Sequence, residues 1–480
     1  MAPTRSPRPR PGPPECERAG GGVPCLVTLV LTVGLTGCSH GAGLAPPPAA
    51  ATDSPPRVSG PQGPVSPQSS QATLATVEAE GRGAAFRRHV AALTALGETL
   101  SAGNSTRLLV DGPATFSAMF PEIEAARSRV LLESYIFEAS PLGERVADLL
   151  LKKRAEGLEV RVIYDSLGAF DTPAAFFDRL RAGGVDVCEF NPIGALRPRD
   201  APLDINHRDH RKVLVVDDRI GFTGGINISN VYASGSVRRR YTRADAAGWR
   251  DTHVRLEGPV VKELARGFQE IWERQSCAGS PFPKPGTTTP PPQQQQNDDR
   301  LVVPIHSYGD GDSSRFYRAL LAAIREARLS IRITMAYFVP DPGLVAALQD
   351  AARRKVAVEL VLPGKSDSRL VRRAGQARYD ELLTAGVRIY ERHDTFVHAK
   401  TAVIDGVWST IGSSNLDWRS FLHNDEVNVV ILGREFGAEM EGLFAEDRGH
   451  ADEVPREAWR KRGISQRAEE AFAQLWQYWF

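Results

Sequence analysis

A repeated motif places the same residue types at the same offsets in two distant parts of the chain. The copies occupy residues 206–227 and 397–415 of 480. In each copy a histidine is followed by lysine at +2, aspartate at +7, glycine at +14 and asparagine at +17. Five residues that match at the same spacing make coincidence a poor explanation, so we expect two similar lobes. The matched residues are His210, Lys212, Asp217, Gly224 and Asn227 in the first copy, and His398, Lys400, Asp405, Gly412 and Asn415 in the second.

The residues between lysine and aspartate are apolar or β-branched in both copies, reading Val-Leu-Val-Val and Thr-Ala-Val-Ile. Such runs predict a β-strand, on which a histidine and a lysine two residues apart project from the same face. The aspartates stand an odd number of residues after the histidines, so on a continuing strand they would project from the opposite face. Asp217-Asp218 and Asp405-Gly406 are typical of hairpin turns, which favours a structural role for Asp217 and Asp405.

The segments around both copies alternate between strand-like and helix-like patterns. This alternation is typical of βαβ units, in which helices cover both faces of a largely parallel sheet. We therefore expect an α/β fold of two related lobes, each a mostly parallel β-sheet flanked by helices. The expected strands are 107–110, 130–138, 159–164, 329–338, 357–362 and 387–390, and the expected helices are 142–154, 174–182, 313–327, 344–354 and 379–384.

The first 37 residues have the pattern of an export signal. Several arginines precede an apolar run at 25–35, which is too short to span a bilayer comfortably. The run ends in Leu-Thr-Gly-Cys at 35–38, which resembles the processing box of bacterial lipoproteins. We favour a lipoprotein signal peptide at 1–37 and lipidation of Cys38, which predicts a membrane-anchored lipoprotein facing the periplasm. Ser39 favours the outer membrane, and an ordinary cleaved signal or an uncleaved anchor is the alternative.

Composition marks the remaining boundaries. Residues 38–83, which are rich in Ala, Pro, Ser and Gly, predict a disordered tether behind the lipidated cysteine. Residues 280–299, which are rich in Pro, Thr and Gln, predict a linker. The first lobe is therefore expected at 84–279, the second at 300–450, and a helical tail at 451–480.

Two surface features have alternative interpretations. Arginines in the insertion at 233–247 form either a solvated face or a contact for anionic lipid headgroups. An apolar stripe in the tail either lies on a membrane or packs on its own domain, and the second is the more frequent reason for such a stripe. The arginines are Arg238, Arg239, Arg240 and Arg243; the stripe is Ile464, Ala468, Phe472, Leu475, Trp476 and Trp479, preceded by Arg460, Lys461 and Arg462.

Charge and cysteine content exclude some classes of protein. The formal net charge is +1, and the chain after residue 37 carries −1, which argues against a dedicated nucleic-acid surface. Cys188 and Cys277 are the cysteines of the exported body, and they either pair or remain as thiols. No cysteine and histidine cluster has the spacing of a zinc site.

The motif resembles the phospholipase D superfamily, whose signature His-x-Lys-x4-Asp-x6-Gly-Ser-x-Asn occurs twice. Over roughly residues 85–450 the chain looks most like the bacterial cardiolipin synthase branch. There the first copy commonly reads Gly-Gly-x-Asn, so Gly225 stands where the second copy has Ser413. The segments that carry the likeness are 224–227, 249–259, 336–348, 385–391 and 414–426.

The resemblance implies phosphodiester chemistry at one cleft shared by two lobes. Two imidazoles supply a nucleophile and an acid, and His210 is expected to form a phosphohistidine while His398 acts as acid and base. The other candidate catalytic residues are Lys212 and Lys400, together with Asp217 and Asp405 from the signature. Phosphate donors are expected in Asn227, Asn415 and Ser413, and Asp251 and Glu426 are expected to orient the histidines.

The function implied is a phosphatidyltransferase that makes cardiolipin from phosphatidylglycerol, needing no metal or other cofactor, no nucleic acid and only a monomer. A hydrolytic phospholipase D that releases phosphatidic acid uses the same residues and is the alternative. A nuclease is disfavoured, because it would want a basic channel with stacking aromatic residues.

Overall fold

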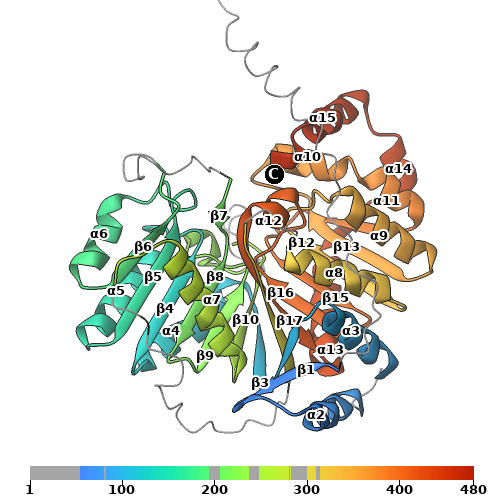
Figure 1. Cartoon of the computed structure of the whole chain (residues 1–480). Helices are drawn as coiled ribbons and strands as arrows, with labels where there is room; N and C mark the ends of the chain where they lie inside the picture. Colours follow the sequence, from blue (N-terminus) through green and yellow to red (C-terminus); the bar gives the residue numbers. More distant parts are fainter. Residues whose placement is uncertain are drawn as a thin grey trace, which may run out of the picture. The chain divides into compact units, whose positions relative to one another are not determined.

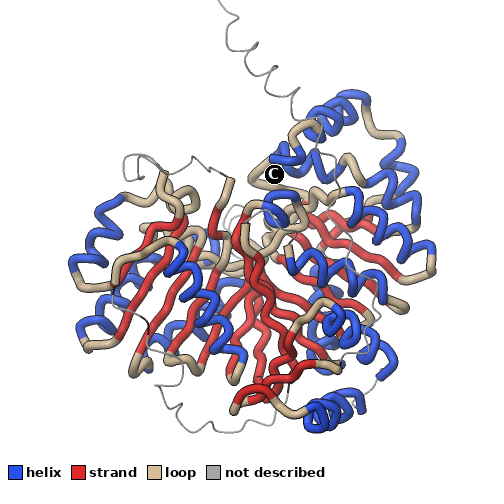
Figure 2. Tube along the Cα trace, viewed as in Figure 1, coloured by secondary structure: helices blue, strands red, loops and turns tan. Residues whose placement is uncertain are grey.

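The computed structural model describes residues 55–79, 83–193, 206–236, 248–279, 282, 300–309 and 314–479. Among the helices in these ranges, none combines the length and apolarity needed to cross a bilayer. Three of the sequence predictions lie outside the described residues: the signal peptide with Cys38, the arginine-rich insertion, and almost the whole linker at 280–299. The strands lie together in the interior, and helices cover them (Figures 1 and 2).

The first lobe is a mixed sheet in the order β6-β5-β4-β8-β9-β10-β3. Helices α5 and α6 connect β4, β5 and β6, which are therefore parallel, whereas the motif strands β8 and β9 form an antiparallel hairpin. The elements are β3 (Thr99–Val110), α4 (Asp111–Ala125), β4 (Arg129–Ser134), α5 (Pro141–Ala155), β5 (Glu159–Asp165), α6 (Ala174–Ala182), β6 (Asp186–Phe190), β7 (Arg208–Asp209), β8 (Lys212–Val216), β9 (Ile220–Gly224), η1 (Asn230–Tyr232), β10 (Thr252–Glu257) and α7 (Val260–Arg274).

The second lobe repeats this arrangement in the order β18-β14-β13-β12-β15-β16-β17-β11. The parallel part is again the βαβ part. The elements are β11 (Arg300–Ser307), α8 (Arg315–Glu326), β12 (Ser330–Met335), α9 (Pro342–Arg353), β13 (Ala357–Pro363), α10 (Arg369–Gln376), α11 (Tyr379–Ala385), β14 (Arg388–Arg392), β15 (Lys400–Ile404), β16 (Trp408–Gly412), α12 (Trp418–Leu422), β17 (Asn424–Leu432), α13 (Arg434–Gly449) and β18 (Ala451–Glu453). The expected two-lobed α/β fold is confirmed.

Strand β3 belongs to both lobes. Its second half pairs with β10 of the first lobe, and its first half pairs with β11 of the second. An apolar core also spans the lobes, because Phe268 of α7 and Phe436 of α13 are buried in one cluster with strand residues of both halves. The lobes are thus continuous in hydrogen bonding and in packing, which fixes the geometry of any site between them.

The motif aspartates hold the hairpins to the neighbouring strands. Asp217 accepts hydrogen bonds from the backbone amides of residues 127–129, and Asp405 accepts them from residues 328–330, just before β4 and β12 respectively. Both residues have positive φ, 54° and 52°, as a tight turn between antiparallel strands requires. Both carboxylates therefore serve the hairpins, and this explains why Asp217 and Asp405 point away from the face of the strand that carries the histidines.

The predicted tether at 38–83 is wrong from residue 55 onward. Residues there form β1 (Arg57–Gly60), β2 (Gly63–Pro64) and α2 (Pro67–Ala79), and α3 (Gly83–Ala95) follows. Strand β1 pairs in parallel with β3, and Val58 and Val77 are buried in the core of the second lobe. A few well-placed valines anchor this segment although its composition is that of a disordered chain.

Cys188 on β6 and Cys277 just after α7 form a disulfide, with their Cα atoms 5.5 Å apart. The bond joins an outer strand of the first lobe to the helix that packs against both lobes. The sequence left this pairing open, because two cysteines alone define no framework.

We expect Asp405→Ala to lower the free energy of unfolding by about 1–3 kcal/mol at neutral pH, because three backbone amides lose their acceptor. Burial alone would raise the pKa of Asp405, but the nearby His89 ring and the backbone amides outweigh burial and lower it. A depressed pKa means that this stabilisation is complete above the ordinary aspartate pKa of about 3.9 and disappears as the pH falls below it. Urea unfolding between pH 7 and pH 3 measures the difference.

The matched control is Asp350→Ala on the exposed surface of α9, where Arg353 is the one partner of the carboxylate among the residues that the structure describes. Equal stability of Asp405→Ala and the wild type at pH 7 would contradict the structural role.

Candidate active site

Each motif histidine is held by the backbone of the other half of the chain. The amide of His210 donates to the carbonyl of Asp425 at 2.9 Å, and the amide of His398 donates to the carbonyl of Arg250 at 2.7 Å. These bonds belong to two short parallel pairings across the lobes, β7 with the start of β17, and Val397 with Arg250. Because Asp425 and Arg250 immediately precede Glu426 and Asp251, each pairing brings a histidine beside a carboxylate of the opposite lobe.

The imidazole rings are also hydrogen-bonded to these carboxylates of the opposite lobe. His210 Nδ1 lies 3.0 Å from Glu426 Oε1, and His398 Nδ1 lies 2.7 Å from Asp251 Oδ2. A carboxylate at Nδ1 fixes the ring tautomer and leaves Nε2 for chemistry. The four residues predicted from the sequence are therefore brought together, in pairs that cross the lobes.

Both histidines line one cavity of about 290 Å³. Tyr135 packs edge-on against His210, with ring centroids 5.0 Å apart, and Tyr337 packs edge-on against His398 at 6.3 Å. Within the described ranges, no three His, Cys, Asp or Glu side chains cluster in a way that could hold a metal ion. The lining also includes Ile136, Arg208, Asn227, Trp249, Asp367, Val371, Asn415, Asp417, Arg419, Ser420 and Asn424.

The two motif lysines lie behind the histidines rather than on the cavity wall. The ammonium of Lys212 donates to the carbonyl of His210, and that of Lys400 donates to the carbonyl of His398. Lys400 Nζ is also 3.0 Å from His398 Nδ1. Burial lowers the pKa of Lys212 to about 7 and that of Lys400 to about 8. The two ammonium groups therefore act on a substrate in the cavity electrostatically, from behind the imidazoles, and not through direct contact.

Ser413 does not face the cavity as a phosphate donor. Its hydroxyl donates to Glu426 and accepts from the amide of Val427 at 3.0 Å, so it positions the carboxylate that holds His210. At the equivalent place in the first lobe, a Cβ on Gly225 would lie 2.1 Å from Asp251 Oδ1. The Gly-Ser difference between the copies therefore reflects how closely each backbone approaches its carboxylate.

The buried imidazoles are poor bases in this structure. Burial, and then the neighbouring lysines, lower the pKa of His210 well below its usual range and that of His398 to about 4. Both rings are consequently neutral at pH 7. A neutral imidazole has a free lone pair at Nε2, which a nucleophile needs.

The two carboxylates differ in protonation. Burial raises the pKa of Glu426 to about 7, so it readily holds a proton. Burial also acts to raise the pKa of Asp251, but the charge and hydrogen bond of His398, followed by Lys400, outweigh it and lower that pKa. An ionised carboxylate stabilises an imidazolium, so His398 is the ring better suited to carry a proton.

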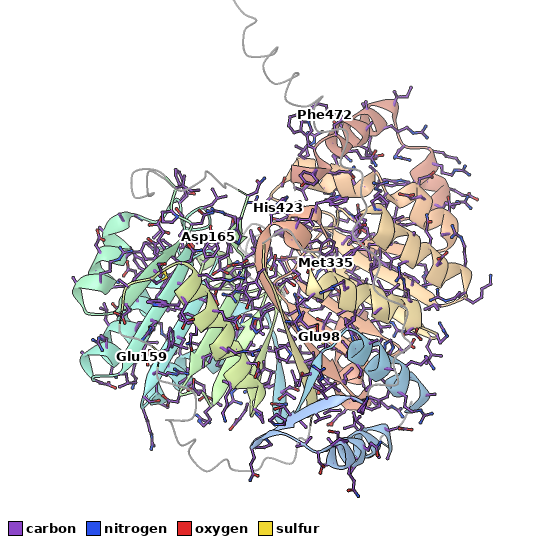
Figure 3. The ribbon with its side chains drawn as sticks, in the orientation of Figure 1. Glu98, Glu159, Asp165, Met335, His423 and Phe472 are labelled. Carbon is purple, nitrogen blue, oxygen red and sulfur yellow. A yellow bond between two sulfur atoms is a disulfide. The ribbon has the colours of Figure 1, made fainter. Side chains whose placement is uncertain are left out.

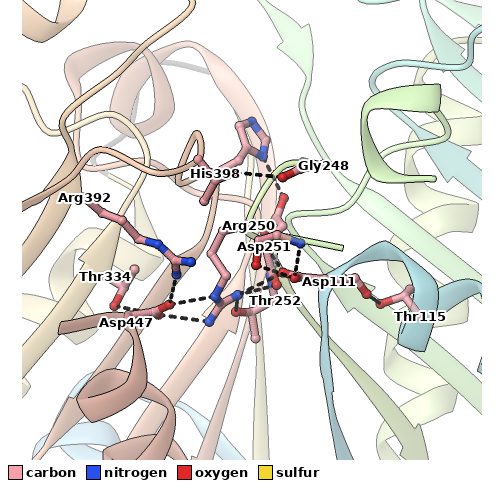
Figure 4. Close-up of polar contacts among 12 residues, drawn as sticks. Asp111, Thr115, Gly248, Arg250, Asp251, Thr252, Thr334, Arg392, His398 and Asp447 are labelled. Carbon is pink, nitrogen blue, oxygen red and sulfur yellow. Dashed lines mark hydrogen bonds and ion pairs between the residues drawn. The ribbon is translucent and has the colours of Figure 1, made fainter. Parts of the chain in front are cut away.

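A second network holds Asp251 in place, as Figure 4 shows. Arg250 forms a bidentate pair with Asp447 of α13, at 2.7 and 2.9 Å, and Arg392 donates to the same carboxylate at 2.9 Å. The amide of Asp251 donates to Asp111 at 3.0 Å. The strand that carries Asp251 is thus clamped to the second lobe by buried ion pairs.

Several residues of the site were missed by the sequence reasoning. Tyr232 is fully buried, and its hydroxyl lies 3.0 Å from His398 Nδ1. Tyr135 and Tyr337 occupy equivalent places just after β4 and β12, so aligning the two lobes beyond the motif would have found them. Tyr232 and Arg419 have no such signal, because the second lobe has serine where the first has Tyr232.

Comparisons with known proteins agree with this geometry. The family model described as "Cardiolipin synthase, PLD-like domain" matches residues 119–241 and 320–448. The chain is 33% identical over 374 residues to cardiolipin synthase 1 of Bacillus anthracis, covering 77% of this chain and 72% of that protein. It is 35% identical over 364 residues to cardiolipin synthase A of Pseudomonas fluorescens, covering 75% and 72%.

Among solved structures, phosphatidylserine synthase of Haemophilus influenzae superposes with a TM-score of 0.58 at 13% identity. The match covers 78% of this chain and 95% of that chain. At this identity the likeness concerns the fold alone.

Proposed function

Because the chain belongs to the family of cardiolipin synthases with phospholipase D-like domains, we propose that its cavity transfers a phosphatidyl group from one phospholipid to a hydroxyl of another. The proposed donor and acceptor are both phosphatidylglycerol, which gives cardiolipin and free glycerol. The observation that carries the proposal is the pair of histidines on one cavity, each held by a carboxylate of the opposite lobe. Both halves come from one chain, so a monomer suffices.

In the first step His210 Nε2 attacks phosphorus, and the bond between phosphorus and the glycerol oxygen breaks. His398 gives its proton to the departing oxygen, and a phosphatidyl-histidine remains on His210. In the second step the neutral His398 takes the proton of the acceptor hydroxyl, whose oxygen attacks phosphorus. The bond from phosphorus to His210 then breaks, and both imidazoles return to their starting states.

The electrostatics of the site support this division of roles. Nucleophilic attack needs the neutral ring that burial imposes on His210. The acid must be protonated, and His398 lies against ionised Asp251. Burial lowers the pKa of His398 to about 4, so the ring must gain a proton when the substrate binds. An anionic phosphodiester places a second negative charge beside the ring, which raises this lowered pKa and favours uptake of that proton. Lys212 and Lys400 stabilise the additional charge of the transition state from behind the rings.

The cavity wall supports a phospholipid acceptor rather than water. Arg419 lines the cavity from α12, and within the described ranges its guanidinium has no hydrogen bond or ion pair. A guanidinium is well suited to the phosphate of a second phospholipid. Asp367 and Asp417 on the same wall offer carboxylate oxygens to glycerol hydroxyls. Hydrolysis to phosphatidic acid, the second candidate, would need neither feature.

The test is incubation of the purified full chain with phosphatidylglycerol labelled in its acyl chains, followed by separation of cardiolipin from phosphatidic acid. We expect cardiolipin from the wild type, in the presence or absence of chelators, and none from His210→Ala or His398→Ala. Arg419→Gln is expected to lower the ratio of cardiolipin to phosphatidic acid about tenfold, since a charged hydrogen bond to the acceptor is lost.

Arg353→Gln, on the exposed surface of α9, is the matched control for Arg419→Gln and should leave the ratio unchanged. Phosphatidic acid as the main wild-type product would favour the hydrolytic alternative. Turnover that chelators abolish would count against the histidine mechanism.

We also propose that the enzyme is an exported lipoprotein, anchored through Cys38 on the periplasmic side of the cell envelope, with the outer membrane favoured. The support is the Leu-Thr-Gly-Cys box at 35–38 and the disulfide between Cys188 and Cys277, since disulfides persist in oxidising compartments. Acyl chains on Cys38 would keep the cavity close to its lipid substrate.

Replacing Cys38 by alanine is expected to release the protein from the membrane fraction and to remove labelling by a fatty-acid probe. Cys188→Ala is the control for loss of a cysteine elsewhere and should leave the labelling intact. Unchanged labelling of Cys38→Ala would refute lipidation at this residue.

A further inference from the structure

The C-terminal helix α15 (Ile464–Gln474) packs on the protein through its polar face. Glu469 pairs with Arg369 and Arg373 of α10 at 2.7 and 2.9 Å, and Glu470 is buried against Arg462. Ala473 contributes the small apolar contact, in one cluster with Val339 and Ala374. These ion pairs fix the rotation of the helix about its axis.

The apolar face of α15 is consequently turned to solvent. Ile464 is 86% exposed, Phe472 56% and Leu475 78%, and Ala468 is exposed between them. The spacing of four and three residues places these side chains in one stripe along the helix. The prediction that this stripe packs on its own domain is therefore wrong for these four residues, because the salt bridges on the opposite face decide the orientation.

The surroundings of the stripe are basic. Arg460, Lys461 and Arg467 are exposed at the start of the helix, and the acidic residues Glu469 and Glu470 are engaged on the inner face. An apolar face flanked by exposed cations is the pattern of a helix that lies in the plane of an anionic lipid surface.

The helix that carries the stripe packs against the cavity wall. Helix α10, against which α15 packs, carries Val371 on the cavity wall. Just after α15, Tyr478 is 43% exposed and contacts Trp418, with ring centroids 6.0 Å apart. Trp418 precedes Arg419 on α12. Figure 1 shows α15, α10 and α12 at one end of the second lobe, and Figure 3 places Phe472 there.

We propose that α15 is a membrane-docking helix, which inserts Ile464, Ala468, Phe472 and Leu475 into the interface of a bilayer containing anionic phospholipid. This would bring the mouth of the cavity to the lipid surface. The inference rests on the proposed function, since a phosphatidyltransferase must take its phospholipid substrate from a bilayer. It is independent of the lipid anchor at Cys38.

Docking predicts a difference between substrate forms. The double variant Phe472→Ser and Leu475→Ser, in the full chain, is expected to lose at least about tenfold in activity on phosphatidylglycerol vesicles, because two large apolar groups no longer leave water. On short-chain phosphatidylglycerol below its micellar concentration, the variant should match the wild type. Leu329→Ser, at a 53% exposed position just before β12, is the control and should behave as the wild type on both substrates.

Equal losses on vesicles and on monomeric substrate would show a structural defect and overturn the proposal, as would unchanged activity on both.

Binding of α15 to lipid can also be measured without an activity assay. Hydrogen exchange of residues 464–475 should slow when vesicles of phosphatidylglycerol are added to the full chain, even if no cardiolipin is formed. Unchanged exchange would overturn the proposal, and slowing that depends on protein concentration without vesicles would identify a second copy of the chain as the occupant.

Discussion

The site depends on an exchange between the halves of the chain, in which each histidine is bonded through its backbone and its ring to the opposite half. The backbone amide of His210 donates to the carbonyl of Asp425, and its ring is hydrogen-bonded to the carboxylate of Glu426. The backbone amide of His398 donates to the carbonyl of Arg250, and its ring is hydrogen-bonded to the carboxylate of Asp251. Neither lobe alone contains a complete pair. Strand β3, which pairs with both sheets, and the apolar core around α7 and α13 hold the lobes at the separation that these bonds require.

This arrangement buries two imidazoles, two ammonium groups and two carboxylates around one cavity. Burial of unpaired charge is costly, and the structure offsets it with surrounding ion pairs such as that of Arg250 with Asp447. The same burial determines the protonation states. It keeps His210 neutral and lowers the pKa of Lys212, while Asp251 remains ionised beside His398. Burial favours the neutral form of both imidazoles, so the two rings differ in their carboxylates: Asp251 beside His398 stays ionised, whereas Glu426 beside His210 readily holds a proton.

The repeat in the sequence was sufficient to predict the two α/β lobes and a shared site, and the strand parity separated Asp217 and Asp405 from the histidines. It could not show which carboxylate holds which ring, because that depends on the crossing of β7 and β17 between lobes. It could not show that the Ser413 hydroxyl donates to Glu426 either, because these two residues meet only in the folded chain. The order of residues 55–79 was missed, because composition does not show that a few valines will be buried. The outward face of α15 was only the less favoured of two alternatives, because spacing does not show which face of a helix its salt bridges will turn inward.

The most direct test is a crystal structure of the full chain with vanadate, an analogue of the pentacoordinate phosphorus of the transition state. The account predicts a single vanadate in the cavity, with Nε2 of His210 and Nε2 of His398 on opposite sides of it and each Nδ1 still bonded to the carboxylate of the other lobe. Two separate ions, or one ion contacted by only one histidine, would contradict the claim that the halves share one reacting centre.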